Sequence, residues 1–279
     1  MATVLRAGPE RFPSGSRDRR LPACASRGRD GASVIVIVSL TAWKRPHYLR
    51  ETLDALEAAG SEIDELVYVV TRVEPNERED EVLALLDRGP HWRTILNEKR
   101  LGLQRNNLAA ISDAWELAAL TGEDYVLGLS EDIVLAPDAL RLAVWMRERY
   151  RTDRQVQFTG LFSGAEPERF KAGGDAEPPA GYLRVTKSEW FYCQGWGTWR
   201  DRWEEDWLPN WNRVGRDDSW DSNVNPFVMQ GRVQTLPLLS RCKHIGLLDG
   251  THSTPENFVN DNPTRFAGDE VIPDGPFCD

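Results

Sequence analysis

Short apolar runs alternate with helix-like stretches between residues 33 and 150. The run Val34–Val38 is β-branched throughout, which is typical of a strand buried on both faces of a sheet. After Pro46, leucines recur at helical spacing until Gly60. The alternation continues, with further strands predicted at residues 66–70, 94–96 and 125–129 and helices predicted after Asp80, around Leu108–Ala118 and after Pro137. Strands that alternate with helices predict an α/β fold, in which a mostly parallel sheet is flanked by helices.

The second half of the chain is less periodic. Strands are predicted at residues 156–162 and 182–185, with a Gly/Pro-rich loop over 172–181 between them, and another β-like run covers 233–239. Residues 1–32 contain seven arginines and three acids, which predicts a disordered basic leader. We therefore expect a leader followed by one domain over residues 33–279, whose second half is the less regular one.

Composition narrows the class of protein. Lys plus Arg total 34 and Asp plus Glu total 44, so the net charge of −10 argues against a protein that coats nucleic acid. No apolar run approaches the roughly eighteen residues of a membrane span, and no secretory signal is visible. The four cysteines form no CxxC pair, which argues against a zinc site, while a Cys193–Cys242 disulfide stays open. We expect a cytoplasmic protein, and 29 arginines against five lysines fit a GC-rich bacterial or phage genome.

An acidic pair follows the fourth predicted strand. Ser130, Glu131 and Asp132 stand at its carboxyl end, where α/β sheets bind their ligands. Two acids there can hold a divalent cation through oxygen ligands, with diphosphate oxygens completing the shell. An isolated acidic pair is more often a solvated turn, so the position in the fold is what favours a binding site.

Several motifs in this order resemble the type A (GT-A) nucleotide-sugar glycosyltransferases, and most nearly the N-acetylglucosaminyltransferases of N-glycan and O-mannose glycan synthesis. The first half contributes residues 41–46, 102–106, 130–132 and 136–138. The second half contributes residues 195–199, 215–221, 240–241, 245–246 and 250–252. The resemblance covers about residues 33–258 and implies a Rossmann-like GT-A fold with a donor half over about 33–135 and an acceptor half over about 136–279. Ser130 departs from the family's acidic triplet.

The resemblance implies a divalent cation, Mn or Mg, and a set of donor contacts. Asp132 would be the direct metal ligand, and His252 would join the metal or the diphosphate, the alternative being an exposed histidine. Arg45 and Arg105 carry fork-shaped donors that suit diphosphate oxygens, with surface ion pairing as the alternative. Glu74 would contact the nucleobase. The expected donor-binding residues are Thr41, Arg45, Glu74, Arg105, Glu131 and Trp196.

The same match places the acid–base chemistry in the second half. An inverting transfer needs one carboxylate to take the proton of the acceptor hydroxyl. Asp218 would be this general base, and Asp217 would orient it or bind the acceptor. Asp221 is a lesser rival for the base and a candidate acceptor contact, whereas helix capping is the alternative for the Asp217–Asp218 pair.

Seven of the eleven tryptophans fall within residues 190–220. Five of them are spaced three or four residues apart, which on a helix makes one aromatic stripe. We expect Trp199, Trp203 and Trp207 to be core residues. Trp196 and Trp220 flank the glycine and aspartate motifs and are expected to stack on the donor and the acceptor, respectively.

These observations predict a metal-dependent, inverting glycosyltransferase that moves a hexosyl or N-acetylhexosaminyl group from a UDP-sugar to an acceptor hydroxyl. The acceptor is a glycan or a hydroxylated nucleobase of modified DNA, the latter being the one case in which nucleic acid is a partner. Two alternatives stay open: a non-catalytic carbohydrate-binding protein of the same fold, and a sugar-nucleotide nucleotidyltransferase. A nucleotidyltransferase would have a Gly-rich phosphate loop after the first strand, and residues 41–46 of this chain contain no glycine.

Overall fold

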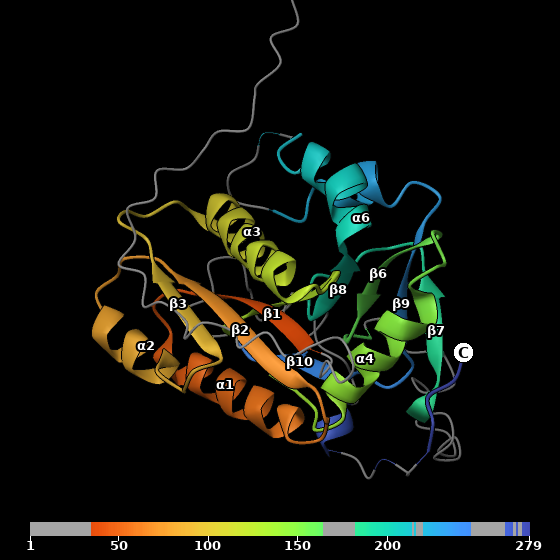
Figure 1. The fold of residues 1–279 in the computed structure, drawn as a ribbon, viewed down its shortest axis with the longest axis horizontal. Helices are drawn as coiled ribbons and strands as arrows, with labels where there is room; N and C mark the ends of the chain where they lie inside the picture. Colours follow the sequence, from red (N-terminus) through yellow and green to blue (C-terminus); the bar gives the residue numbers. More distant parts are fainter. Residues whose placement is uncertain are drawn as a thin grey trace, which may run out of the picture.

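An eight-stranded sheet organises the chain, seen here in a computed structural model that describes residues 35–163, 182–213, 215, 220–246, 266–269, 272 and 275–279. The predicted leader over 1–32 and the predicted loop over 172–181 lie outside these residues. The strand order is β3-β2-β1-β4-β8-β6-β9-β7 (Figure 1). In that order the strands are Trp92–Leu96, Leu66–Val73, Ile35–Ala42, Tyr125–Ser130, Trp196–Trp199, Val156–Gly160, Val233–Pro237 and Val185–Ser188.

Parallel pairing dominates the sheet, as predicted. β3, β2, β1 and β4 are parallel neighbours, and β6 also runs parallel to β9. β8 is antiparallel to both β4 and β6, and β7 is antiparallel to β9. The first four strands are therefore the regular half of the α/β fold, and the mixed strands belong to the less periodic half.

Helices cover both faces of the sheet (Figure 1). α1 (Pro46–Gly60), α2 (Glu79–Leu86) and α4 (Ala139–Tyr150) share one apolar core with the sheet, whereas α3 (Leu103–Thr121) belongs to a second core on the opposite face. α1 begins at its proline as predicted, because the ring fixes the backbone angle that a first helical residue needs. None of the helices in the described ranges is long and apolar enough to cross a membrane.

A second, two-stranded sheet was not predicted. β5 (Ile133–Leu135) pairs antiparallel with β10 (Cys242–His244), so that His244 lies opposite Ile133. β5 directly follows the acidic pair and packs on α1. This small sheet therefore places residues 242–246 near the carboxyl end of β4.

The tryptophan segment differs from the predicted single helix. Trp196 and Trp199 lie on β8, where an offset of three residues places them on opposite faces, and each belongs to a different core. The chain then continues as a short helix, α6 (Arg200–Arg202), a π-helix over Trp203–Trp207 and a 3₁₀ turn over Leu208–Asn210. The expected burial of Trp199, Trp203 and Trp207 is confirmed, although they do not form one helical stripe.

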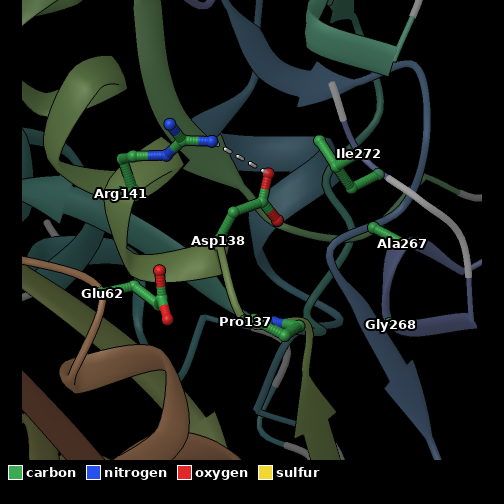
Figure 2. A pocket seen from close by; sticks show the side chains of 7 residues that line it. All are labelled: Glu62, Pro137, Asp138, Arg141, Ala267, Gly268 and Ile272. Atoms are coloured by element: carbon green, nitrogen blue, oxygen red, sulfur yellow. Dashed lines mark ion pairs between the residues drawn. The ribbon is translucent and has the colours of Figure 1, made fainter. Parts of the chain in front are cut away.

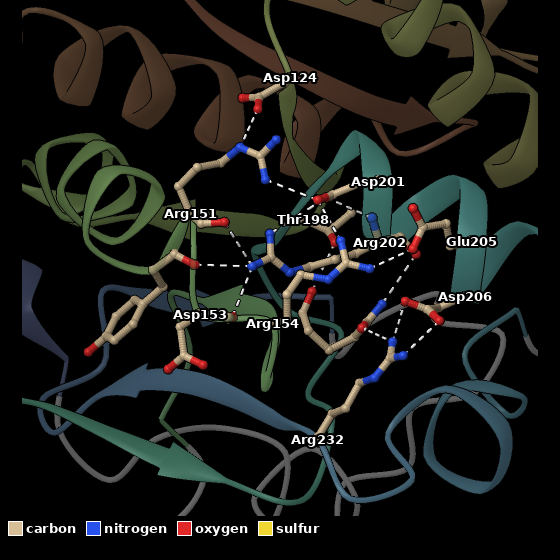
Figure 3. Close-up of polar contacts among 12 residues, drawn as sticks. Asp124, Arg151, Asp153, Arg154, Thr198, Asp201, Arg202, Glu205, Asp206 and Arg232 are labelled. Atoms are coloured by element: carbon tan, nitrogen blue, oxygen red, sulfur yellow. Dashed lines mark hydrogen bonds and ion pairs between the residues drawn. The ribbon is translucent and has the colours of Figure 1, made fainter.

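A buried arginine ties this segment to α4 (Figure 3). Arg202 is fully buried and donates from Nη2 to the carbonyl oxygens of Tyr150, Arg151 and Asp153 at 2.9–3.1 Å. Its guanidinium also lies 3.8 Å from the centroid of the Trp199 ring. The last carbonyls of a helix lack intrahelical partners, so Arg202 satisfies the end of α4 and fixes β8 beside it. Burial lowers the pKa of Arg202, since desolvation disfavours its charge.

The question of a disulfide is settled by the described cysteines. No disulfide joins Cys193 and Cys242. The Cys242 thiol is fully buried, and its Sγ lies 3.6 Å from the carbonyl oxygen of Gln194. Burial raises the pKa of this thiol, because the apolar surroundings disfavour a thiolate.

Gly128 on β4 gives a stability prediction. A Cβ atom at this position would overlap the indole ring of Trp196, which is itself 3% exposed and cannot swing out. We expect Gly128→Ala to lower the free energy of unfolding by about 1–3 kcal/mol, as overpacking in a core does. Urea denaturation measures it, with Gly60→Ala as the control, because a Cβ there makes only an ordinary contact at 3.4 Å. Equal stability of the two variants would contradict the packing described.

Candidate functional site

The segments that follow β1 and β4 meet at the carboxyl ends of the parallel strands. Thr41 on β1 lies opposite Arg72 on β2 and Ser130 on β4, so the ends of these strands are level. The chain leaves β4 with the Glu131 amide donating to the Thr41 carbonyl oxygen at 3.1 Å. The segments after β1 and β4 are thus held side by side where α/β sheets bind their ligands.

Arg45 joins the two acids of the predicted site. Its Nε donates to Glu131 Oε1 at 2.7 Å, and its Nη2 lies 2.8 Å from Asp132 Oδ2. The backbone amide of Trp43 donates to the other Glu131 oxygen at 2.6 Å. The side chains of Arg45, Glu131 and Asp132 are 17%, 4% and 8% exposed, so this is a nearly buried cluster rather than a solvated turn.

His244 completes the cluster from the small sheet. Its Nε2 lies 3.1 Å from Asp132 Oδ2, and the next amide, that of Ile245, donates to the Asp132 carbonyl oxygen at 2.8 Å. No local pattern in the sequence singles out His244. The available signal was its position between the two matched segments 240–241 and 245–246.

The charges of the cluster are set by burial and by its ion pairs. Desolvation raises the pKa of Glu131, and its contacts with Arg45 and the Trp43 amide do not offset it. Asp132 also loses solvation, but the hydrogen bond with His244 and the charge of Arg45 outweigh that loss and lower its pKa. The pKa of Arg45 is raised, because the two carboxylates outweigh its own desolvation. Asp132 and Arg45 are therefore held as an ion pair.

Asp132 and His244 together fit a divalent cation. A carboxylate oxygen and an imidazole nitrogen are both accepted ligands, and neighbouring ligands of one small ion lie about 3 Å apart, as these two atoms do. A Cβ at position 246 would overlap Asp132 Oδ2, so the glycine there lets the backbone after His244 pass close to this oxygen. Within the described ranges, no group of three or more His, Cys, Asp or Glu side chains is placed to hold a metal ion. Asp132 and His244 would be two ligands of such an ion, and its other positions would be open to further ligands.

Glu74 shapes the loop before α3. Its Oε1 accepts hydrogen bonds from the amides of Leu101 and Gly102, each at 2.7 Å, and the side chain is almost fully buried. Arg100 lies 3.7 Å from its other oxygen and 4.3 Å from the centroid of the Trp43 ring. The predicted nucleobase contact of Glu74 stays a prediction, whereas its contacts in the structure are with the backbone of this loop.

Arg105 is exposed in the first turn of α3. Its neighbour Gln104 is buried and donates to Asn212 Oδ1 at 3.0 Å, which fixes this turn against the segment that leads to the predicted aspartate pair. Arg105 thus stands on an anchored turn with its side chain open to solvent. Its contact with a diphosphate stays a prediction.

Trp196 and Trp220 are less open than predicted. They are 3% and 7% exposed and belong to one aromatic cluster, with ring centroids 6.0 Å apart. Trp220 stacks on Trp211, with centroids 5.9 Å apart and an interplanar angle of 16°. The rings pack on each other and leave little surface for a sugar, because β8 turns Trp196 onto Gly128. The stacking of both residues on substrate stays a prediction, and in the structure the rings contact each other and their aromatic neighbours.

Three predicted site residues, Asp217, Asp218 and His252, lie outside the described residues. Asp221 is described, and its carbonyl oxygen accepts a hydrogen bond from the Val224 amide at 2.9 Å at the start of the next helical turn. The structure thus brings together Thr41, Arg45, Glu131 and Asp132. It adds His244, and it places Trp196 and Trp220 in the core.

A separate pocket of about 330 Å³ lies at the other end of α1 (Figure 2). Arg45 precedes this helix and Glu62 follows it, and fifteen residues of helix span about 22 Å. The pocket is lined by Glu62, Pro137, Asp138, Arg141, Ala267, Gly268 and Ile272. Arg141 lies 3.9 Å from Asp138, whose carboxylate also accepts hydrogen bonds from the buried Arg241. This pocket is therefore distinct from the acidic cluster.

No protein-family model and no curated protein matches the sequence. Among solved structures, S. aureus TarS 1–349 in complex with UDP-GlcNAc is 10% identical, with 82% of this chain and 64% of that chain covered and a TM-score of 0.48. The mannosyltransferase PcManGT from Pyrobaculum calidifontis, in complex with GDP-Man and Mn²⁺, is 15% identical over 81% and 63%, with a TM-score of 0.45. Glucosyl-3-phosphoglycerate synthase from Mycobacterium tuberculosis, with Mn²⁺, UDP-Glc and glycerol 3-phosphate, is 13% identical over 81% and 75%, with a TM-score of 0.42.

The chain spans less than two thirds of the length of the first two of these structures. At identities of 15% or lower and TM-scores below 0.5, these likenesses assign no role to individual residues of this chain.

Proposed function

We propose that this chain is a glycosyltransferase that moves a sugar from a nucleotide donor to an acceptor hydroxyl with the help of a divalent cation. The observation that carries the proposal is the nearly buried cluster of Arg45, Glu131, Asp132 and His244 at the carboxyl end of β4. Its position favours a bound ligand over a structural ion pair, because strand ends at this edge are where α/β sheets bind nucleotides. The motif order in the sequence supports the same assignment.

The described residues have distinct roles in this proposal. Asp132 and His244 hold the cation, Mn or Mg, which when bound neutralises the charge of the leaving diphosphate. Arg45 and Arg105 pair with diphosphate oxygens through guanidinium donors. Glu131 fixes the segment after β1 by accepting a hydrogen bond from the Trp43 amide. The motif resemblance adds His252 as a contact of the metal or the diphosphate.

Asp218 is the proposed general base, with Asp217 orienting it. The acceptor oxygen attacks the anomeric carbon while its proton passes to the Asp218 carboxylate. The bond between that carbon and the diphosphate oxygen breaks, and the electron pair leaves with the nucleoside diphosphate. Attack from the side opposite the leaving group inverts the anomeric configuration, and no protein acid is needed for a leaving group stabilised by cations.

The finer assignments follow from the motif resemblance. We propose UDP as the nucleotide, a hexosyl or N-acetylhexosaminyl group as the sugar, and a glycan or a hydroxylated nucleobase as the acceptor. Residues of about 33–135 form the donor half and those of about 136–279 the acceptor half, with Asp221 at the acceptor. A cytoplasmic location in a bacterial or phage-infected cell is part of the same proposal.

Donor binding tests the function. The protein is titrated with a panel of UDP- and GDP-sugars, with and without Mn²⁺, and followed by thermal unfolding and by the slow release of free sugar. We expect at least one UDP-sugar to raise the unfolding temperature in a Mn²⁺-dependent way, because a ligand that binds only the folded state stabilises it. If no nucleotide sugar changes either readout, the chain is not a glycosyltransferase of this kind.

A further inference from the structure

Arg45 occupies the place where the acidic pair would meet a cation. Its Nη2 lies 2.8 Å from Asp132 Oδ2, the oxygen that also contacts His244 Nε2 at 3.1 Å. A metal ion and a guanidinium on one carboxylate oxygen would be about 4 Å apart, and two cations repel strongly at that distance in a poorly solvated site. The arginine and a metal ion therefore cannot both hold Asp132 Oδ2 without a large electrostatic cost.

The frame around the acids does not depend on Arg45 alone. The Trp43 amide holds Glu131 Oε2 at 2.6 Å, and Thr52 Oγ1 donates to the Glu131 carbonyl oxygen at 2.8 Å. The Ile245 amide holds the Asp132 carbonyl oxygen. These contacts keep both acids in place when the guanidinium leaves, so what remains is a preformed, nearly buried anionic site.

We propose that Arg45 is the resident counter-ion of the acidic pair, and that a divalent cation binds Asp132 only by displacing its guanidinium. This inference rests on the proposed function, because it takes the cluster to be a cation site. The displaced guanidinium is left facing the same strand edge, where a donor diphosphate supplies new oxygen partners. Metal and donor therefore bind cooperatively. The metal replaces the guanidinium as the partner of Asp132, and the donor diphosphate replaces Asp132 as the partner of Arg45.

Mn²⁺ binding without nucleotide tests the displacement. The probe is Mn²⁺ alone, measured by loss of the electron paramagnetic resonance signal of the free ion. We expect Arg45→Gln to bind Mn²⁺ about tenfold more tightly than the wild type, because the competing charge is gone. Arg50→Gln, which removes an exposed arginine of α1, is the matched control and is expected to change the affinity less than about twofold. Asp132→Asn in the Arg45→Gln background should remove the added affinity.

A second pair of variants covers the case in which Arg45→Gln does not fold. Glu131→Gln removes the neighbouring buried charge and leaves Arg45 on Asp132, and Arg45→Gln/Glu131→Gln then removes the guanidinium without leaving Glu131 unpaired. We expect the double variant to bind Mn²⁺ about tenfold more tightly than Glu131→Gln. Circular dichroism of each variant verifies the fold before the comparison.

The displacement is overturned if removing Arg45 leaves Mn²⁺ affinity unchanged or lower in either pair, including the case in which no variant binds Mn²⁺. Titration of the wild type with UDP and with UDP-sugars is run in parallel. Donor binding with unchanged Mn²⁺ affinity overturns the inference and keeps the proposed function. Absence of donor binding under all conditions overturns the proposed function itself.

Discussion

Replacing Asp218 with asparagine is expected to lower the rate of sugar transfer about 10³-fold, while donor binding stays unchanged. The physical reason is that asparagine keeps the size and polarity of the side chain but cannot take the proton of the attacking hydroxyl. Transfer would then depend on water as the base, which is a far weaker one. Transfer is measured by release of the nucleoside diphosphate in the presence of acceptor, and donor binding by calorimetry.

The same substitution at the neighbouring acids Asp217 and Asp221 tests whether the effect is specific to Asp218. Asp217→Asn should reduce transfer less, because an orienting residue leaves the base in place. Asp221→Asn tests the rival, which follows the buried Trp220 and precedes a helical turn. If Asp218→Asn keeps the wild-type rate while Asp221→Asn loses it, the base is Asp221 and the match of the aspartate pair is out of register.

Asp132→Asn is expected to weaken Mn²⁺-dependent donor binding and to slow transfer about 10²-fold. The side chain keeps its shape, but the charged oxygen that faces both Arg45 and His244 is replaced by a neutral group. A metal ion that stabilises a leaving diphosphate contributes several kcal/mol, and a loss of about 2.7 kcal/mol corresponds to 10²-fold. Calorimetric titration of UDP-sugar with and without Mn²⁺ measures the binding component.

Asp64→Asn is the control for this variant. Asp64 lies exposed in the turn between α1 and β2, so the same chemical change there should leave binding and transfer unchanged. Retention of Mn²⁺-dependent binding in Asp132→Asn would place the metal elsewhere. The acidic cluster would then be an ion pair that supports the loop rather than a ligand site.

The regular half of the fold could be predicted from the sequence because each element has a strong local signal. Strands such as β1 are buried on both faces and are therefore continuous apolar runs, and α1 begins at a proline and repeats leucines at helical spacing. The acidic pair could be predicted as well, because a strand's carboxyl end is known once the strand is. These features depend on residues that are close together in the chain.

The second half could not be predicted in the same way. The tryptophan spacing of three and four residues indicates a helix, yet Trp196 and Trp199 lie on a strand whose pairing with β4 and β6 depends on residues far away in sequence. β5 and β10 are three residues long, too short to show a period. His244 therefore had no local signal, although it lies 3.1 Å from Asp132.

The amino-acid sequence was enough to predict the parallel strand–helix half and the acidic pair at the end of β4, and it made Arg45 a candidate diphosphate contact. The contacts of Arg45 with both acids, the contact of His244 with Asp132 and the burial of the Trp196 and Trp220 rings became visible in the folded chain. The physical reason is the range of the interactions. Periodicity and helix starts are local, whereas ion pairs and ring packing depend on which distant segments the folded sheet brings together.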